Sequence, residues 1–125
     1  MTAFSEAPTP VADYYRILDG GIDSYDRQDL LPLLDDDLVF QGPVGEPMTA
    51  GKAGFAEGFG GFIANCRGIV PIQLVTGGDQ AAALYDAALP GGVMRFAEFF
   101  IMERGVIREL RLLFDPADYA AKVEG

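Results

Sequence analysis

The sequence contains no histidine. Histidine is the usual proton-transfer residue near neutral pH, and it belongs to serine- and cysteine-based nucleophile systems and to nearly all zinc sites. Any catalysis must therefore use carboxylates, tyrosines, arginines or lysines. We expect neither a metal ion nor an organic cofactor.

Basic residues and cysteine are also scarce. Nine lysines and arginines stand against 19 acidic residues, a net charge of -10. This balance argues against binding to nucleic acid or to an anionic membrane surface, and it favours a neutral or cationic partner or a second copy. The single cysteine, Cys66, cannot form an internal disulfide, and no apolar run approaches the roughly 20 residues that span a bilayer. We expect a cytoplasmic protein.

With 125 residues the chain is long enough for one domain with one core. We expect a flexible arm over residues 1–9 and a single domain over residues 10–125. The pair Thr9-Pro10 predicts the start of a first helix, and Asp26 predicts the cap of a second. The acidic run at residues 35–37 is expected to end that second helix.

A third helix is predicted over residues 52–66. Phe55, Phe59 and Phe62 recur in it at the spacing of a core-facing stripe. The same helix carries three glycines at a similar spacing, for which we expect close contact with a sheet. They are Gly54, Gly58 and Gly61.

Strands are predicted over residues 38–42, 69–76, 81–89, 93–103 and 106–114. The last four are separated by glycine-containing turns, which indicates an antiparallel meander. The Gly- and Pro-rich segment 42–51 joins the first strand to the third helix. Phe40 and the phenylalanine stripe are expected to wall an apolar pocket.

Three helices, a strand between the second and third, and a four-stranded meander resemble the nuclear transport factor 2-like superfamily over roughly residues 10–118. That superfamily includes ketosteroid isomerase, limonene epoxide hydrolase and SnoaL-like polyketide cyclases. The most specific segments are GPVGEP at residues 42–47 and ERGVIRELRLLFDP at residues 103–116. The resemblance implies an α+β cone-shaped barrel, with a curved, mostly antiparallel sheet wrapped around three N-terminal helices, an apolar cavity and frequent dimerisation.

The catalytic residues of these relatives are mostly not kept. The base, the tyrosine and the acid of ketosteroid isomerase fall at Gly42, Leu18 and Ala97, so its mechanism is not expected here. Of the three groups of limonene epoxide hydrolase, only the one at Asp86 remains. The other two places hold Leu84 and Leu112.

Two-residue turns at Gly91-Gly92 and Arg104-Gly105 would pair Asp86 with Ala97 and Glu98 with Arg111. Alternation then sorts the strand residues into two faces. One face is expected to be concave and to line the cavity: Leu84, Asp86, Arg95, Ala97, Phe99, Ile101, Leu110, Leu112 and Phe114. The other is expected to form a homodimer interface through Tyr85, Phe96, Glu98, Phe100 and Arg111.

Asp86 is the main catalytic candidate. Apolar neighbours would raise its pKa towards the range useful for proton transfer, whereas Arg95 would lower it. The pair could act as an acid or base, orient a substrate group, or be only a structural ion pair. Tyr14 or Tyr15 could polarise a substrate oxygen, or both could be core residues. The catalytic set is Asp86, Arg95 and Tyr14, and the expected pocket residues are Tyr15, Leu18, Phe40, Phe55, Phe59, Phe62, Leu84, Ala97, Phe99, Leu110 and Leu112.

These residues predict a pocket for a small apolar molecule, and an enzyme that performs proton transfer, isomerisation or hydrolysis on it. Two alternatives remain open. The pocket could bind such a molecule without catalysis, or the chain could be an interaction module with a vestigial cavity. An open cavity to which Asp86 is exposed would favour catalysis, an open but wholly apolar cavity would favour binding, and a cavity filled by phenylalanines would favour the interaction module.

Overall fold

The computed structural model describes residues 4–45 and 51–125, so residues 46–50 of the predicted turn at 42–51, Glu46 and Pro47 among them, lie outside the described residues. The elements follow one another in this order: α1 (Thr9–Gly20), the 3-10 turn η1 (Ile22–Ser24), α2 (Arg27–Leu30), the 3-10 turn η2 (Leu31–Leu33), β1 (Leu34–Gln41), α3 (Gly51–Asn65), β2 (Ile69–Gly77), β3 (Gln80–Leu89), β4 (Gly92–Glu103), β5 (Val106–Leu113) and α4 (Pro116–Glu124).

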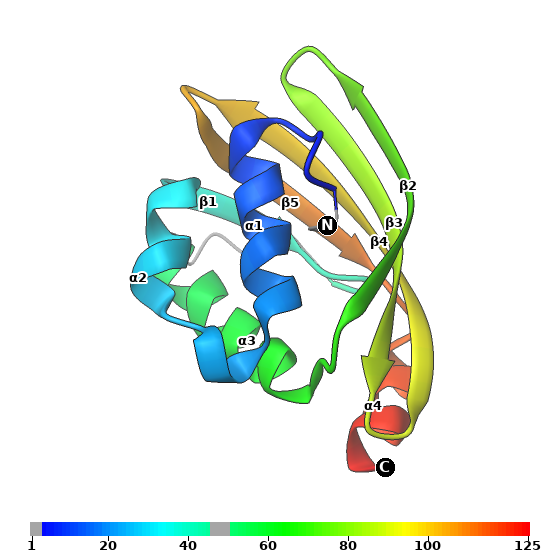
Figure 1. Ribbon diagram of the computed structural model, residues 1–125. Coiled ribbons are helices and arrows are strands. Elements are labelled where there is room, and N and C mark those ends of the chain that lie inside the picture. Colours follow the sequence, from blue (N-terminus) through cyan, green and yellow to red (C-terminus); the bar gives the residue numbers. More distant parts are fainter. Residues whose placement is uncertain (1–3, 46–50) are drawn as a thin grey trace.

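The five strands form one curved sheet in the order β1-β5-β4-β3-β2, and α1, α2 and α3 lie together on one side of it (Figure 1). β1 pairs with β5 in parallel, and the other neighbours are antiparallel. β1 and β2 are the two edges, so the sheet is open rather than closed. The predicted α+β class with a cone-shaped fold is confirmed. No helix in the described parts of the chain is long and apolar enough to cross a membrane.

The first helix buries the stripe that its sequence predicts. Val11, Tyr14, Tyr15 and Leu18 are all less than 5 % exposed. Phe4, within the expected flexible arm, is also buried, with its ring 4.8 Å from that of Tyr15. The core therefore begins well before residue 10.

The acidic run at residues 35–37 does not end a helix, as the sequence had suggested, but lies inside β1. Leu34 and Leu38 on either side of it are buried, and Leu34 pairs with Ile107 of β5. Burial of these two leucines and pairing with a neighbouring strand outweigh the weak strand propensity of aspartate. The strand consequently begins four residues earlier than predicted.

The strand registers differ from those that two-residue turns at the expected places would give. Leu89 pairs with Gly92, so Pro90 and Gly91 form the turn and Asp86 lies opposite Arg95. Between β4 and β5, a bulge near Arg108 shifts the pairing by one residue. Glu98 therefore lies opposite Leu112, not Arg111.

The assignment of the two sheet faces is wrong for β3 and β4, although Leu110 and Leu112 of β5 lie on the inner side as predicted. The face turned towards the helices is the one that carries Tyr85, Phe96, Glu98 and Phe100, each about 1 % exposed. Phe99 on the opposite face is 44 % exposed. Four of the five residues predicted for a dimer interface thus lie in the core, and only Arg111 is exposed. Apolar side chains populate both faces, so alternation alone could not decide which one the helices cover.

Candidate functional site

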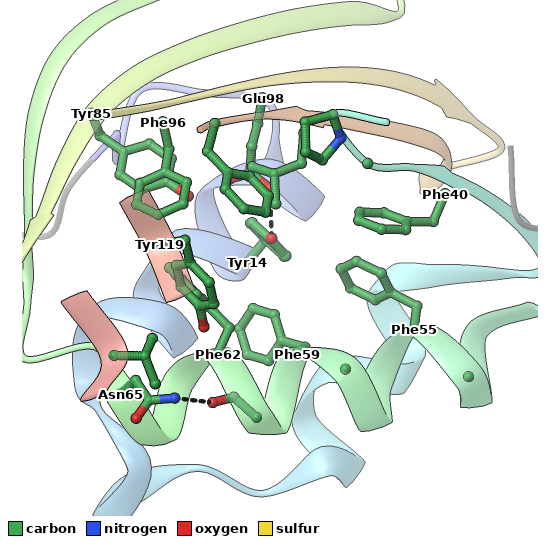
Figure 2. Close-up of a pocket in the computed structure, with 18 residues that line it drawn as sticks. Tyr14, Phe40, Phe55, Phe59, Phe62, Asn65, Tyr85, Phe96, Glu98 and Tyr119 are labelled. Atoms are coloured by element: carbon green, nitrogen blue, oxygen red, sulfur yellow. Dashed lines mark hydrogen bonds between the residues drawn. The ribbon is translucent and has the colours of Figure 1, made fainter. Parts of the chain in front are cut away.

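A pocket of about 500 Å³ lies between α3 and the inner face of the sheet (Figure 2). The lining residues that the structure describes are mainly aromatic, with one carboxyl, one amide and three phenols among them. The lining residues are Tyr14, Phe40, Gly42, Pro43, Gly54, Phe55, Gly58, Phe59, Gly61, Phe62, Asn65, Tyr85, Phe96, Glu98, Leu112, Phe114, Tyr119 and Val123.

Glu98 is the polar centre of this pocket. Strand β4 directs it towards the helices, and it is only 1 % exposed. The hydroxyl of Tyr14 donates to Oε2 at 2.7 Å, and the hydroxyl of Tyr15 donates to Oε1 at 2.7 Å. Two consecutive residues of α1 therefore fix both oxygens of one carboxyl (Figure 2 shows Tyr14 and Glu98).

Burial raises the pKa of Glu98 above its ordinary value, because the ionised form loses its hydration. Hydrogen bonds from Tyr14, Tyr15 and Tyr85 act in the opposite direction, since they favour the carboxylate, but their effect is smaller. Burial also raises the pKa of Tyr14 well above its ordinary value, and the charge of Glu98 raises it further. The phenol consequently stays protonated and remains a donor.

The phenylalanine stripe of α3 forms one aromatic wall. Phe55 and Phe59 are buried, and the Phe55 ring lies 5.2 Å from that of Phe40 on β1. On the sheet side, the rings of Tyr85 and Phe96 are stacked at 5.6 Å with an interplanar angle of 14°. The predicted pocket wall is therefore present, and a second aromatic wall faces it.

The C-terminal helix α4 completes the enclosure with Tyr119 and Val123. Asp115 caps this helix by accepting the N–H groups of Ala117 and Asp118 at 3.0 and 3.1 Å. At its other end, the N–H of Gly91 donates to the carbonyl oxygen of Lys122 at 2.7 Å. The turn between β3 and β4 thereby holds α4 against the sheet, at the end of the molecule where both lie in Figure 1.

Asp86 and Arg95 lie outside this pocket, contrary to the prediction. Arg95 donates to both carboxylate oxygens of Asp86, at 2.9 and 3.2 Å, on the outer face of the sheet. The Arg95 side chain is 64 % exposed. Hydrogen bonding from Arg95 lowers the pKa of Asp86, where the sequence argument expected apolar neighbours to raise it. This geometry is that of a surface ion pair.

The remaining predicted pocket residues divide into three groups. Tyr14, Phe40, Phe55, Phe59, Phe62 and Leu112 line the cavity. Tyr15, Leu18 and Leu110 are buried in the core beside it but are not among the lining residues. Leu84, Ala97 and Phe99 alternate with the inward residues and lie on the outer face.

Sequence reasoning assigned Glu98 to the wrong face, and it missed Tyr119 and Asn65. A signal for Glu98 was present, because it is the one charged residue in the otherwise apolar run from Phe96 to Met102. A lone carboxylate in such a run is expensive to bury unless it is hydrogen bonded. No comparable signal marks Tyr119, whose position depends on how α4 folds back.

Among residues 4–45 and 51–125, no three histidine, cysteine, aspartate or glutamate side chains gather in a way that could hold a metal ion. Asp36 of the acidic run is paired with Lys52 at 2.9 Å. Asp35 accepts the backbone N–H of Asp37 at 2.8 Å. These contacts give Asp35 and Asp36 of the acidic run structural roles.

Comparison with known proteins places this architecture in a family. The model of the SnoaL-like domain matches residues 11–110. The chain belongs to the SnoaL-like domain family. The match covers α1 from Val11 onwards, the sheet up to Leu110 and all of α3, and so includes Glu98 and both tyrosines of α1. Comparison with curated proteins found no match.

Solved structures share this SnoaL-like fold at low sequence identity. A protein from Kribbella flavida is 21 % identical with a TM-score of 0.79, over 97 % of this chain and 99 % of that one. A steroid delta-isomerase from Pseudomonas aeruginosa is 15 % identical with a TM-score of 0.74, over 98 % and 88 %. TerC, co-crystallised with polyporic acid, is 17 % identical with a TM-score of 0.68, over 93 % and 99 %. At these identities the likeness shows the fold alone.

Proposed function

We propose that this SnoaL-like protein is an enzyme that binds a small, uncharged, largely apolar molecule and transfers a proton to or from it through Glu98. The observation that carries the proposal is a buried carboxyl, held by two tyrosines, at the wall of an open aromatic pocket. Pockets of this size with few convergent polar groups are typical of small-molecule sites.

The charge of the pocket favours an uncharged ligand. Among the lining residues that the structure describes there is neither lysine nor arginine, so nothing there would balance a ligand carboxylate or phosphate. An anion would also oppose the carboxylate that Glu98 becomes when it gives up its proton, because like charges repel strongly in a low-dielectric surrounding. A carbonyl or hydroxyl group instead gains a hydrogen bond from the protonated carboxyl.

Glu98 suits proton transfer because its pKa is raised above the ordinary value. In the proposed step, protonated Glu98 donates its proton to a ligand oxygen. The resulting carboxylate is stabilised by the hydroxyls of Tyr14 and Tyr15. It then accepts a proton from a carbon of the same ligand, so Glu98 is restored and the net result is an isomerisation.

This scheme differs from the mechanism of ketosteroid isomerase. That mechanism is not expected here, because the chain does not keep the catalytic residues of that enzyme. Gly42, at the place expected for that enzyme's base, lines the pocket without any side chain. Glu98 is the one carboxyl among the lining residues that the structure describes, so in this scheme the same group gives and takes the proton. The steroid delta-isomerase and the complex of TerC with polyporic acid support a ring-containing ligand for this fold.

A pocket that binds without catalysis is the second candidate. The hydrogen bonding of Glu98 favours this candidate. Each carboxyl oxygen already accepts a hydrogen bond from a tyrosine hydroxyl, and the side chain is almost fully buried. In that case the carboxyl would only orient the ligand.

Exchange of carbon-bound hydrogen with solvent deuterium separates the two candidates. Wild-type protein is incubated with a panel of cyclic ketones in D₂O, and deuterium incorporation is followed by NMR. Proton transfer by Glu98 predicts exchange that Glu98→Gln reduces by about 100-fold or more. The matched control is Asp86→Asn, which removes a carboxylate from the outer face and should leave exchange unchanged. Binding of a ketone without exchange in wild type would favour the non-catalytic candidate.

A further inference from the structure

Helix α4 covers one end of the pocket, although little of the helix is buried. Tyr119 and Val123 line the cavity, yet none of the nine residues of α4 is fully buried, whereas α1 buries five residues and α3 four. The helix therefore covers the cavity without being embedded in the core. It begins at Pro116, beyond the residues 11–110 that match the SnoaL-like model, so the family match does not account for this cover.

The side chain of Tyr119 packs at the place where α3 meets the sheet. There α3 reaches the sheet through Phe62, whose ring lies 5.3 Å from that of Phe96. The glycines of α3 do not make the contact predicted for them, because a Cβ added at Gly58 or Gly61 would meet no atom within 4 Å. The half-buried Tyr119 ring lies 6.1 Å from that of Phe62 and 6.4 Å from that of Phe96 (Figure 2). Contacts between half-buried rings open at a lower cost in free energy than contacts in a filled core.

The backbone holds α4 only at its two ends. At the start of the helix, residues 114–115 are the whole connection to β5, which ends at Leu113. At the other end, the N–H of Gly91 donates to the carbonyl oxygen of Lys122 at 2.7 Å. Within residues 4–45 and 51–125, this is the one backbone hydrogen bond between α4 and a segment distant in sequence. Loss of that single bond would release the far end of the helix.

We propose that α4 is a lid, which swings about residues 114–115 to admit the ligand and closes when Gly91 bonds to Lys122. In the closed form, Tyr119 and Val123 complete the apolar wall and keep water out of the pocket, as closing lids do in many enzymes. This inference rests on the proposed function, because a gate has a role only if the pocket admits and releases a ligand. The rate of ligand entry is then proportional to the fraction of molecules in which α4 is open.

Native-state hydrogen exchange tests the opening of α4 without any ligand. In wild type, the protection factors of the amides of residues 119–124 should be about 100-fold lower than those of the best protected amides of α1. Low concentrations of urea should hardly change them, because a local opening exposes little surface. The lid is overturned if these amides have the same protection and the same urea dependence as α1, since α4 would then open only when the whole protein unfolds.

Stopped-flow fluorescence tests the gate with 6-propionyl-2-(dimethylamino)naphthalene, an uncharged aromatic ketone whose emission changes when it leaves water. Gly91→Ala weakens the closed form, because a Cβ there would lie 2.8 Å from backbone atoms of Lys122. The association and dissociation rate constants should therefore rise together, each about tenfold, while Kd changes by less than about threefold. Gly77→Ala is the matched control and should leave both rate constants unchanged, since a Cβ added there would meet no atom within 4 Å.

The kinetic results decide whether α4 controls entry. Rate constants in Gly91→Ala equal to those of wild type would overturn the gate, because the ketone would then enter elsewhere. Wild type that does not bind the ketone would overturn it as well, since the pocket would have no uncharged ligand to admit. Failure of the proposed function looks different: Glu98→Gln would leave deuterium exchange unchanged, while Gly91→Ala would still speed the entry and release of the ketone.

Discussion

Tyr14 and Glu98 lie 84 positions apart in the chain, and the tyrosine hydroxyl donates to the carboxyl at 2.7 Å. Tyr15 makes the equivalent bond to the other oxygen. Of these two tyrosines only Tyr14 lines the pocket. The hydrogen bonds join α1 to β4 and hold Glu98, the one carboxyl among the described residues that line the pocket.

The two tyrosines should separate stability from binding. Tyr14→Phe and Tyr15→Phe each remove one hydrogen bond to a buried carboxyl, and each should cost about 1–3 kcal/mol in the free energy of unfolding. Both should also raise the pKa of Glu98 further, because each hydroxyl lowers it. Only Tyr14→Phe should directly weaken binding of a cyclic ketone, because Tyr14 lines the pocket and Tyr15 does not. Urea unfolding and NMR titration with the ketone measure the two effects, and an equal loss of affinity in both variants would contradict the assignment of Tyr14 to the pocket.

The pH dependence of stability follows from the raised pKa of Glu98. In the unfolded chain this group ionises near about pH 4.3, while in the folded protein it stays protonated to a higher pH. Between these two pKa values the unfolded state binds fewer protons than the folded state. As pH rises through this window, Glu98 therefore lowers the free energy of unfolding by up to about 1.4 kcal/mol per pH unit. The contribution is favourable below the window and levels off above the folded pKa.

Glu98→Gln should remove this slope. Urea unfolding of wild type and variant between pH 4 and 8 gives the comparison, and the difference in free energy should shift in favour of the variant as pH rises. Parallel curves would show that Glu98 ionises at its ordinary pKa in the folded protein.

The attachment of α4 should depend on the absence of a side chain at Gly91. A Cβ there would lie 2.8 Å from both Cα and the carbonyl oxygen of Lys122, and backbone atoms cannot move aside cheaply. Gly91→Ala should therefore cost about 1–3 kcal/mol and loosen α4. Hydrogen exchange should show reduced protection of the amides of residues 119–124.

Gly77→Ala provides the control for that change. Gly77 is the last residue of β2, next to the turn before β3, and a Cβ added there would meet nothing within 4 Å. In Gly77→Ala, the backbone amides of α4 should exchange hydrogen as they do in wild type. Loss of α4 protection in this variant as well would mean that the effect is general destabilisation and not a contact with Lys122.

The Asp86–Arg95 pair should matter little. Its hydrogen bonds lower the pKa of Asp86, so the contribution of this group is present above the unfolded pKa and is lost as pH falls through the folded one. Solvent screens an exposed pair, and its effect on stability is small. At pH 7 the free energy of unfolding of Asp86→Asn should be close to that of wild type. At acidic pH the stability of the variant should fall less steeply with decreasing pH than that of wild type. A large loss of stability at neutral pH would show that the pair is structurally essential.

The parts of the molecule governed by local periodicity could be predicted from sequence. The helical spacing of Phe55 and Phe59 led correctly to a pocket wall, and the turn glycines led to the meander. The sheet faces could not be assigned in this way. Leu84 and Tyr85 are both apolar, and only the packing of the helices decides which of them turns inward.

The site itself required tertiary information. One extra residue at the bulge near Arg108 changed which side chains of β5 accompany Glu98, and no turn signal marks it. Glu98 looked like half of a surface ion pair with Arg111 because its true partners are two tyrosines from a helix more than 80 positions away. Asp86, by contrast, was placed correctly on the same face as Arg95, but that face is turned to solvent.

The pKa of Glu98 is the most direct test of its proposed role as the proton-transfer group. Its carboxyl ¹³C chemical shift can be followed by NMR against pH, with Glu98→Gln used to assign the signal. A proton-transfer carboxyl in this pocket predicts a titration midpoint above the ordinary value of about 4.3, and a further change when a cyclic ketone is bound. A midpoint at or below about 4.3 that does not respond to the ketone would contradict this role.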